Sequence, residues 1–185
     1  MPRLTDARKE LRRAQITEAA VRCFSRNGLE RTSIADITAE SGLSAGSIYA
    51  HYRNKADLVQ ASARAALAER AEVLGEWAAS AAPPHPDELI TRLIAGIEPD
   101  GARVGVQTWG EATTDPVIRG IVTDMIDRWQ AMLRDCVTAW LVKVEQHEPA
   151  EAAERAAEIT EQVVARYLAA LLHAALYSPI EETAP

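Results

Sequence analysis

Residues 32–58 read TSIADITAESGLSAGSIYAHYRNKADL, and this stretch holds two short runs of helical periodicity on either side of a turn. Ile34 and Ile37 give the first run an apolar stripe, and Ile48 returns to the same small core in the second run. Gly42, between the runs, can end the first helix because glycine adopts a positive φ without strain. The pattern predicts a helix, a three-residue turn and a second helix, which is the layout of a DNA-reading helix-turn-helix.

Two serines are placed to cap the predicted helices. The Ser33 hydroxyl can accept hydrogen bonds from first-turn amides, and Asp36, three residues later, completes a pair that resembles a capping box. Ser44 repeats the cap before the second helix. The exposed positions of that helix carry mostly small side chains, which would let it approach base edges in a major groove. These positions are Ala45, Gly46, Ser47, Ala50 and His51.

Residues 46–58 resemble the signature of the tetracycline-repressor (TetR) family. The resemblance extends from about Gln15 to Leu58, the first third of the chain, and includes an apolar helix over 16–24 and the helix stop Asn27-Gly28. The chain departs from the family pattern at Thr38, where alanine is usual, but a β-branched residue there costs little helix propensity. The resemblance implies an all-α regulator with a helix-turn-helix at its N-terminus.

The resemblance also implies which residues contact DNA. The side chains that match Tyr49, His51 and Lys55 would touch phosphates, and positions 45–47 would face bases. Elementary chemistry supports one of these roles, because Lys55 follows the good N-cap Asn54 and would stand beside free amides where an anion can bind. The full predicted interface comprises Thr32, Ser33, Ser44, Ala45, Gly46, Ser47, Tyr49, His51 and Lys55.

Alternatives remain open for these residues. Taken singly, Tyr49 fits a half-buried aromatic with a solvated hydroxyl, and His51 fits an ordinary surface histidine, so only their joint spacing favours DNA. Residues 42–46, GLSAG, also fit the G-x-S-x-G elbow of a serine hydrolase, which needs a buried strand before Ser44. Residues 33–41 have helical periodicity instead, and 185 residues is short for such an enzyme with its triad, so no catalytic residue is assigned.

Composition favours helices almost throughout. Hydrophobic residues make up 48% and charged residues 25% of the chain, as in globular proteins, while aromatic residues are only 5%. Cys23 and Cys136 lie far apart and are expected to pack as thiols in a reducing cytoplasm. There is no apolar run of signal-peptide or membrane-spanning type, and the scattered histidines lack zinc-site spacing, so no cofactor or metal is expected.

The net charge of −7 hides an uneven distribution. Residues 1–60 contain ten lysine or arginine residues against seven acidic ones, whereas residues 61–185 contain ten against twenty. Five of the basic residues precede Ala14, which predicts either a basic arm that reaches phosphates or a minor groove, or a solvated, frayed terminus. DNA would repel the acidic remainder and so orient the N-terminal end toward itself.

The chain is predicted to divide into a helix-turn-helix domain (1–54) and a helical domain for effector binding and dimerisation (55–185). Periodicity and proline breaks predict helices over 56–80, 87–97, 102–112, 116–144 and 151–177. The last two have wide apolar faces, which predict a homodimer whose two reading helices lie one duplex turn apart and suit a palindrome. A monomeric bundle is the alternative.

The family resemblance further implies that a small molecule binds the C-terminal half and alters the spacing of the reading helices. Ligand pockets are mostly apolar with a few polar groups. The candidate effector-binding residues are Trp77, Gln107, Trp109, Glu111, Met125, Trp129 and His173. Each tryptophan, taken alone, fits a core or an interface better. The sequence therefore predicts a ligand-responsive repressor of a palindromic operator, with a ligand-binding or carrier dimer that lacks a DNA role as the alternative.

Overall fold

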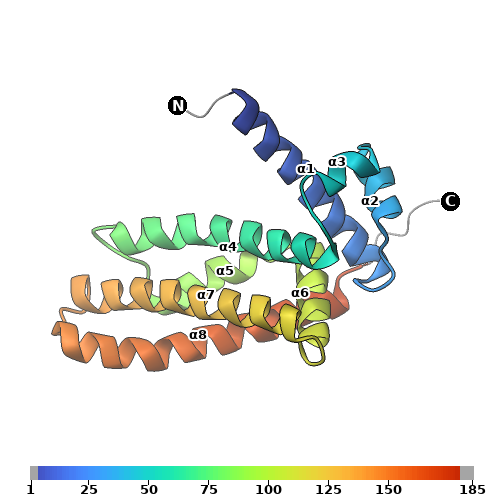
Figure 1. The fold of residues 1–185 in the computed structure, drawn as a ribbon. Helices are drawn as coiled ribbons and strands as arrows, with labels where there is room; N and C mark the ends of the chain where they lie inside the picture. Colours follow the sequence, from blue (N-terminus) through green and yellow to red (C-terminus); the bar gives the residue numbers. More distant parts are fainter. Residues whose placement is uncertain (1–3, 180–185) are drawn as a thin grey trace.

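The computed structural model describes the backbone of residues 4–179 and the side chains of residues 6–65 and 71–179. Every regular element in that part of the chain is an α-helix, which confirms the predicted all-α class (Figure 1). The helices are α1 (Leu4–Asn27), α2 (Ile34–Ser41), α3 (Ala45–Tyr49), α4 (Lys55–Ala79), α5 (Pro86–Ala95), α6 (Pro99–Ala112), α7 (Pro116–Lys143) and α8 (Pro149–Tyr177). None of these described helices has the length and hydropathy needed to cross a membrane.

The helices form two parts that α4 joins. Helices α1, α2 and α3 gather at one end of the molecule, and α4 runs from them beside α7, which in turn packs against α8, so that the long helices form a bundle (Figure 1). Helix α5 packs against α8. Helix α6 lies at the junction of the two parts, because it contacts α1 as well as α7 and α8.

Proline and cap signals set the helix boundaries. Prolines occupy the first turns of α5, α6, α7 and α8, where the missing N–H has no partner to lose. Asn54 caps α4, because its side chain accepts a hydrogen bond from the Asp57 amide at 2.9 Å. The five helices predicted beyond the motif are all present, with bounds shifted by at most three residues.

The basic N-terminal stretch is helical. Helix α1 begins at Leu4, so Arg8, Lys9, Arg12 and Arg13 are exposed side chains on a helix. The structure therefore contradicts a frayed terminus from Leu4 onward, whereas contact of these basic side chains with phosphates or a minor groove stays a prediction. Strong helix formers and the acidic Asp6 in the first turn favour a continuous helix here. The fifth basic residue of the stretch, at position 3, lies outside the described residues.

One core cluster crosses the predicted domain boundary. It contains Phe24 of α1 and Ile48 of α3, and continues through Leu58 of α4 to Val104 of α6 and Val122 of α7. A second cluster fills the bundle between α4, α5, α7 and α8. Because the first cluster has members on both sides of residue 54, the independence of domains 1–54 and 55–185 stays a prediction.

Candidate nucleic-acid interface and ligand cavity

Helix α2 is closed at both ends by the residues that the sequence predicted. The Ser33 hydroxyl accepts from the Asp36 amide at 3.2 Å, and the Asp36 carboxylate accepts from the Ser33 amide at 2.8 Å, which completes a capping box. These hydrogen bonds from the Ser33 backbone and hydroxyl hold the pKa of the Asp36 carboxyl below its ordinary value. At the other end, Gly42 adopts φ +68° and its N–H donates to the Thr38 carbonyl at 3.0 Å.

Helix α3 follows a three-residue turn and is capped by Ser44, whose hydroxyl accepts from the Ser47 amide at 3.2 Å. Helix α2 precedes this serine where a hydrolase elbow needs a strand, so the G-x-S-x-G pattern lacks that geometry. Ile48 is fully buried and fastens α3 to the core. Ala45 and Gly46 are consequently exposed, and Ser47 is half-buried. The side of α3 that was predicted to face bases lies at the surface.

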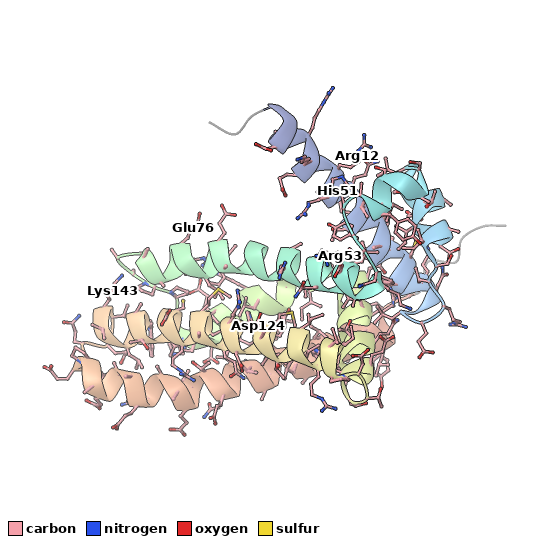
Figure 2. The ribbon with its side chains drawn as sticks, viewed as in Figure 1. Arg12, His51, Arg53, Glu76, Asp124 and Lys143 are labelled. Atoms are coloured by element: carbon pink, nitrogen blue, oxygen red, sulfur yellow. The ribbon has the colours of Figure 1, made fainter. Side chains whose placement is uncertain are left out.

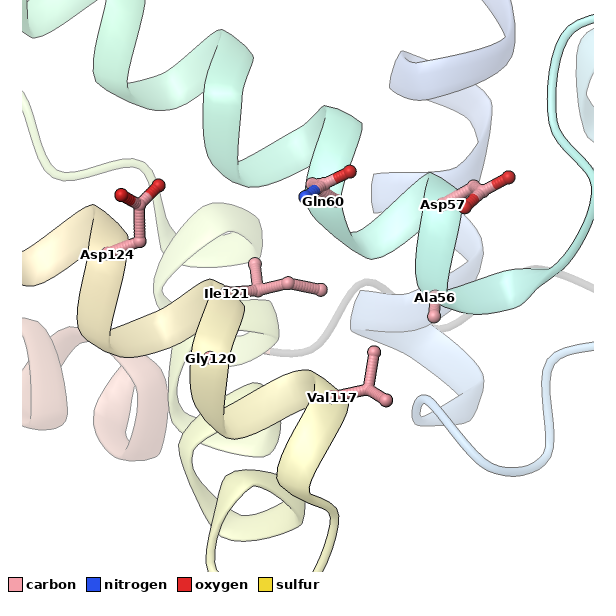
Figure 3. Close-up of a pocket in the computed structure, with 7 residues that line it drawn as sticks. All are labelled: Ala56, Asp57, Gln60, Val117, Gly120, Ile121 and Asp124. Carbon is pink, nitrogen blue, oxygen red and sulfur yellow. The ribbon is translucent and has the colours of Figure 1, made fainter.

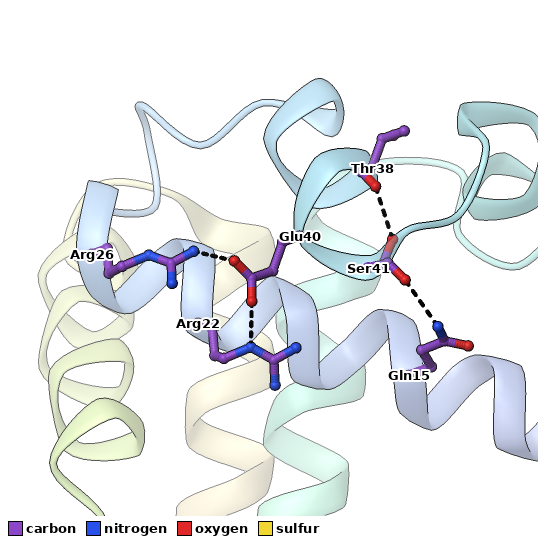
Figure 4. Close-up of polar contacts among 6 residues, drawn as sticks. All are labelled: Gln15, Arg22, Arg26, Thr38, Glu40 and Ser41. Carbon is purple, nitrogen blue, oxygen red and sulfur yellow. Dashed lines mark hydrogen bonds and ion pairs between the residues drawn. The ribbon is translucent and has the colours of Figure 1, made fainter. Parts of the chain in front are cut away.

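Helix α2 is fastened to α1 by a charged contact and an amide contact (Figure 4). Glu40 pairs with Arg22 at 2.6 Å and with Arg26, and hydrogen bonds from Arg26 and then Arg22 hold the pKa of Glu40 below its ordinary value. Gln15 donates through Nε2 to the Ser41 carbonyl at 2.9 Å. Sequence reasoning missed both contacts, because the paired residues are 14 to 26 positions apart.

Two residues of the predicted interface already hold the turn between α1 and α2. Lys55 Nζ donates to the Leu29 carbonyl at 2.6 Å and to the Glu30 carbonyl at 3.2 Å. Thr32 is buried, and its hydroxyl donates to the Gly28 carbonyl at 2.8 Å. An ammonium has three N–H donors, so Lys55 can still offer one to a phosphate. DNA contacts by both residues stay predictions.

Two tyrosines at the end of α3 have opposite surroundings. Tyr49 is 56% exposed, so its hydroxyl is available to a phosphate, and His51 nearby is half-buried. Tyr52 is only 6% exposed and its hydroxyl shares a hydrogen bond with Thr17 Oγ1 at 3.0 Å. The spacing of four residues from Ile48 could have assigned Tyr52 to the core.

Several basic side chains lie at this end of the molecule. Figure 2 shows Arg12, His51 and Arg53 on the part formed by α1–α3 and the start of α4, at the end opposite Lys143. Arg53 is exposed, and sequence reasoning missed it as an individual DNA contact. The available signal was its position between two predicted phosphate contacts, His51 and Lys55.

Tyr52→Phe is expected to lower the free energy of unfolding by about 1 kcal/mol, because the Thr17 hydroxyl loses its buried partner. Urea denaturation followed by circular dichroism measures this loss. Tyr49→Phe removes the same atom from an exposed ring and is expected to change stability by less than about 0.5 kcal/mol. Equal losses in the two variants would contradict the placement of the Tyr52 hydroxyl.

A cavity of about 550 Å³ lies where α1, α4, α6, α7 and α8 meet. Three of the predicted effector residues, Trp109, Met125 and Trp129, line it. Part of its wall comes from α1, through Thr17, Glu18, Val21 and Arg22. A molecule in this cavity would therefore touch the helix on which α2 and α3 are mounted.

The other four predicted effector residues lie elsewhere. The Trp77 ring packs beside the Arg92 guanidinium, whose central carbon is 5.2 Å from the ring centroid. His173 is exposed on α8, and Gln107 accepts a backbone hydrogen bond from the α1–α2 turn. Glu111 is half-buried but is not part of the cavity wall. The cavity thus brings together only the tryptophans and the methionine nearest the junction.

A second pocket, of about 360 Å³, lies between the starts of α4 and α7 (Figure 3). Asp57 and Gln60 line it from α4, and Val117, Ile121 and Asp124 line it from α7. Its described lining contains no aromatic residue and none of the predicted effector residues. The larger, aromatic cavity is the better candidate for a ligand site.

Polar contacts join α1 to α6 beside the larger cavity. The Ser25 hydroxyl donates to the Asp100 carboxylate at 2.6 Å, and the Leu29 amide donates to Gln107 Oε1 at 3.1 Å. Asp100 also pairs with Arg103 at 2.8 Å and lines the cavity. The Ser25 contact thus links α1 to α6 at the cavity wall, and the Leu29 contact links the turn after α1 to α6.

Comparison with known proteins links the chain to bacterial regulators. Residues 16–62 match the family model described as "Bacterial regulatory proteins, tetR family". The transcriptional repressor Rv1474c of Mycobacterium tuberculosis is 33% identical over 133 residues, which cover 64% of this chain and 71% of that protein. The transcriptional regulator TtgR of Pseudomonas putida is 49% identical over 61 residues, which cover 33% of this chain but only 29% of TtgR.

A solved structure extends the likeness beyond the first third of the chain. The transcriptional regulator FadR from Bacillus subtilis, in complex with stearoyl-CoA, has a TM-score of 0.60 and 18% identity to this chain. The superposition covers 88% of this chain and 97% of that chain. The likeness shows a shared helical fold in both the α1–α3 part and the bundle.

Proposed function

Because the chain belongs to the TetR family of bacterial regulatory proteins, we propose that it is a ligand-responsive repressor, in which two copies bind a palindromic operator and a small molecule releases them. The observation that carries the proposal is the outward side of α3. This helix is capped by Ser44 and anchored by Ile48, and it leaves positions 45 and 46 and the ring of Tyr49 exposed and Ser47 half-buried. A helix presented in this way can enter a major groove.

The proposed DNA contacts are the nine residues that the sequence predicted, with Arg53 added. Tyr49 and His51 would donate to phosphates, which fixes the register of the protein on the duplex without reading its sequence. Positions 45–47 offer few long hydrogen-bonding groups to bases, so sequence preference would rest partly on duplex shape.

Dimerisation is proposed through the long helices α7 and α8. Exposed apolar side chains on the last turns of α8 support it, because Leu172, Leu176 and Tyr177 are 45%, 65% and 75% exposed. Pairing with a second copy would remove such side chains from water. A two-fold dimer would set two α3 helices about 34–36 Å apart, which is one turn of duplex.

Ligand response is proposed to start in the cavity of about 550 Å³. A molecule there would contact α1 directly and α6 through the wall that contains Asp100, so it could change the separation of the two α3 helices. FadR, which shares the fold, was solved with stearoyl-CoA bound, and this supports a ligand-binding role for the helical part. The protein would act in the cytoplasm, where its operator lies.

Binding to a fluorescent random duplex tests the proposal. Affinity is expected to fall about a thousandfold or more between about 50 and 200 mM salt, as for a protein that neutralises several phosphates. Selection of bound genomic fragments is then expected to yield a palindrome. Salt-independent, weak binding would favour the carrier alternative instead.

Lys55→Met is expected to weaken binding about equally on all duplexes and to reduce the slope of log affinity against log salt by about 0.9, because one phosphate contact is lost. Lys143→Met is a matched control. Lys143 also donates to backbone carbonyls, those of Ala78 and Ser80 at 2.8 and 2.9 Å, but at the far end of α4. If the slope for Lys55→Met is unchanged, Lys55 does not contact a phosphate and serves only to hold the turn between α1 and α2.

A further inference from the structure

The described lining of the larger cavity is mainly apolar. Trp109 and Trp129 line the cavity, yet their Nε1 atoms are shielded from solvent and have no hydrogen-bond partner among the described residues. An N–H that faced the open cavity would be accessible, so the cavity meets the ring carbons. The hydroxyls of Thr108 and Ser62 already donate to carbonyls of their own helices, at 2.6 and 3.0 Å. The described lining, which also includes Tyr167, therefore offers a ligand mainly aromatic rings and alkyl groups.

The charges at the opening of the cavity are unbalanced. Glu18 and Glu98 are exposed lining residues, so they mark the opening, and neither carboxylate has a hydrogen-bond or ion-pair partner among the described residues. Arg22, the one basic residue among the described lining residues, is already paired with Glu40 at 2.6 Å. Asp100 accepts hydrogen bonds from two side chains. Among the described residues, the opening thus carries two carboxylates without a side-chain partner, and that of Glu98 lies at the positive end of α6.

From these observations we infer that the cavity takes a bulky, lipophilic organic cation. The carboxylates of Glu18 and Glu98 would attract a cation and repel an anion of the same shape. A tryptophan that turns its ring face to the ligand would add a cation–π contact. The charge has to be delocalised or shielded by carbon, because burying a compact ammonium without partners is too costly. The inference rests on the proposed function, since it assigns a chemical class to the ligand of the same cavity.

Tetraphenylphosphonium and tetraphenylborate test the inference, because they share size and shape and carry opposite charges. Their binding to the full chain is measured by calorimetry and tryptophan emission without DNA. The phosphonium ion is expected to bind at least about tenfold more tightly, and the ratio to shrink near 1 M salt because exposed carboxylates are screened. Equal affinities, tighter binding of the borate or no binding of the phosphonium ion would overturn the inference.

Variants at the opening of the cavity test whether its carboxylates cause the preference for a cation over an anion. Glu18→Gln and Glu98→Gln are each expected to weaken phosphonium binding about two- to fivefold, and the double variant to narrow the ratio between the two ions. Glu154→Gln removes the same charge from an exposed position of α8 outside the cavity wall and is expected to change neither affinity. A double variant that binds like the wild type would overturn the role of these carboxylates.

Release of DNA is measured separately, with the selected duplex. If the phosphonium ion binds with the expected preference but leaves DNA bound, the chemical class stands and the ligand-responsive part of the proposed function fails. If DNA binding depends on salt as expected but the phosphonium ion does not bind the cavity, the proposed chemical class of the ligand is wrong and the proposal that the protein binds DNA stands.

Discussion

Gly46→Glu is expected to lower the affinity for DNA by at least about a hundredfold, because like-charge juxtaposition in an interface costs several kcal/mol. Position 46 lies on the exposed side of α3, where we propose that the helix enters the groove. A carboxylate there would face phosphates and base edges with no positive group to compensate it. Fluorescence anisotropy with the selected duplex measures the loss.

The fold is expected to tolerate this substitution. A Cβ at position 46 meets only Ser44 Oγ, at 3.9 Å, and the backbone there is outside the left-handed region. Glycine inside a helix is about 1 kcal/mol less favourable than alanine, and a carboxylate near a helix start is stabilising. The free energy of unfolding should therefore stay the same or rise slightly.

Gly75→Glu is the matched control for this change. Gly75 is an exposed glycine of α4, and a Cβ added there would have no neighbouring atom within 4 Å. The residue lies near the end of α4 (Lys55–Ala79), and this helix runs away from α3 (Figure 1). The control changes the net charge by the same amount, but beyond the screening length of the proposed interface, so we expect an affinity change below about twofold. If both variants bind DNA equally well, α3 is not the recognition helix.

The helix-turn-helix could be predicted because its signals are local. Ser33, Gly42 and Ser44 lie within four residues of the groups that they cap, and the structure confirms each cap at the predicted position. Prolines at the starts of later helices work in the same way, since they act on the first turn that contains them.

The contacts that hold the unit together could not be predicted, because they depend on how distant segments fold back. The sequence shows that Lys55 begins a helix, but not that the Leu29 carbonyl comes within 2.6 Å of its ammonium. The same limit applies to Glu40, whose two arginine partners lie on α1. Local reasoning therefore predicted a phosphate contact for Lys55, whose ammonium also holds the turn between α1 and α2.

The cavity was only partly predictable for a related reason. Periodicity shows that a tryptophan lies on an inward face, but not whether that face meets a packed neighbour or a void. Trp129 lines the cavity, whereas Trp77 packs against Arg92. The contribution of α1 to the wall depends on its packing against α6, which no pattern within either helix reports.

Phe24→Ala is expected to lower the free energy of unfolding by about 3–5 kcal/mol, because it opens a cavity in a close-packed core. Phe24 is fully buried, and its cluster continues to Val104 of α6 and Val122 of α7. The loss should therefore reach both parts of the molecule in a single transition. Urea denaturation is followed at one fixed protein concentration, since the stability of a dimer depends on concentration.

Two probes decide whether the boundary at residue 54 separates independent units. All four tryptophans lie beyond it, so their emission reports on the helical part, whereas circular dichroism reports on the whole chain. A shared core requires Phe24→Ala to move both midpoints together. Leu11 is 71% exposed on the same helix. Leu11→Ala should therefore shift neither unfolding midpoint by more than corresponds to about 0.5 kcal/mol in the free energy of unfolding. An early loss of ellipticity in Phe24→Ala with unchanged tryptophan emission would instead show that the α1–α3 unit unfolds alone, and that its contacts with α6 contribute little to the stability of the bundle.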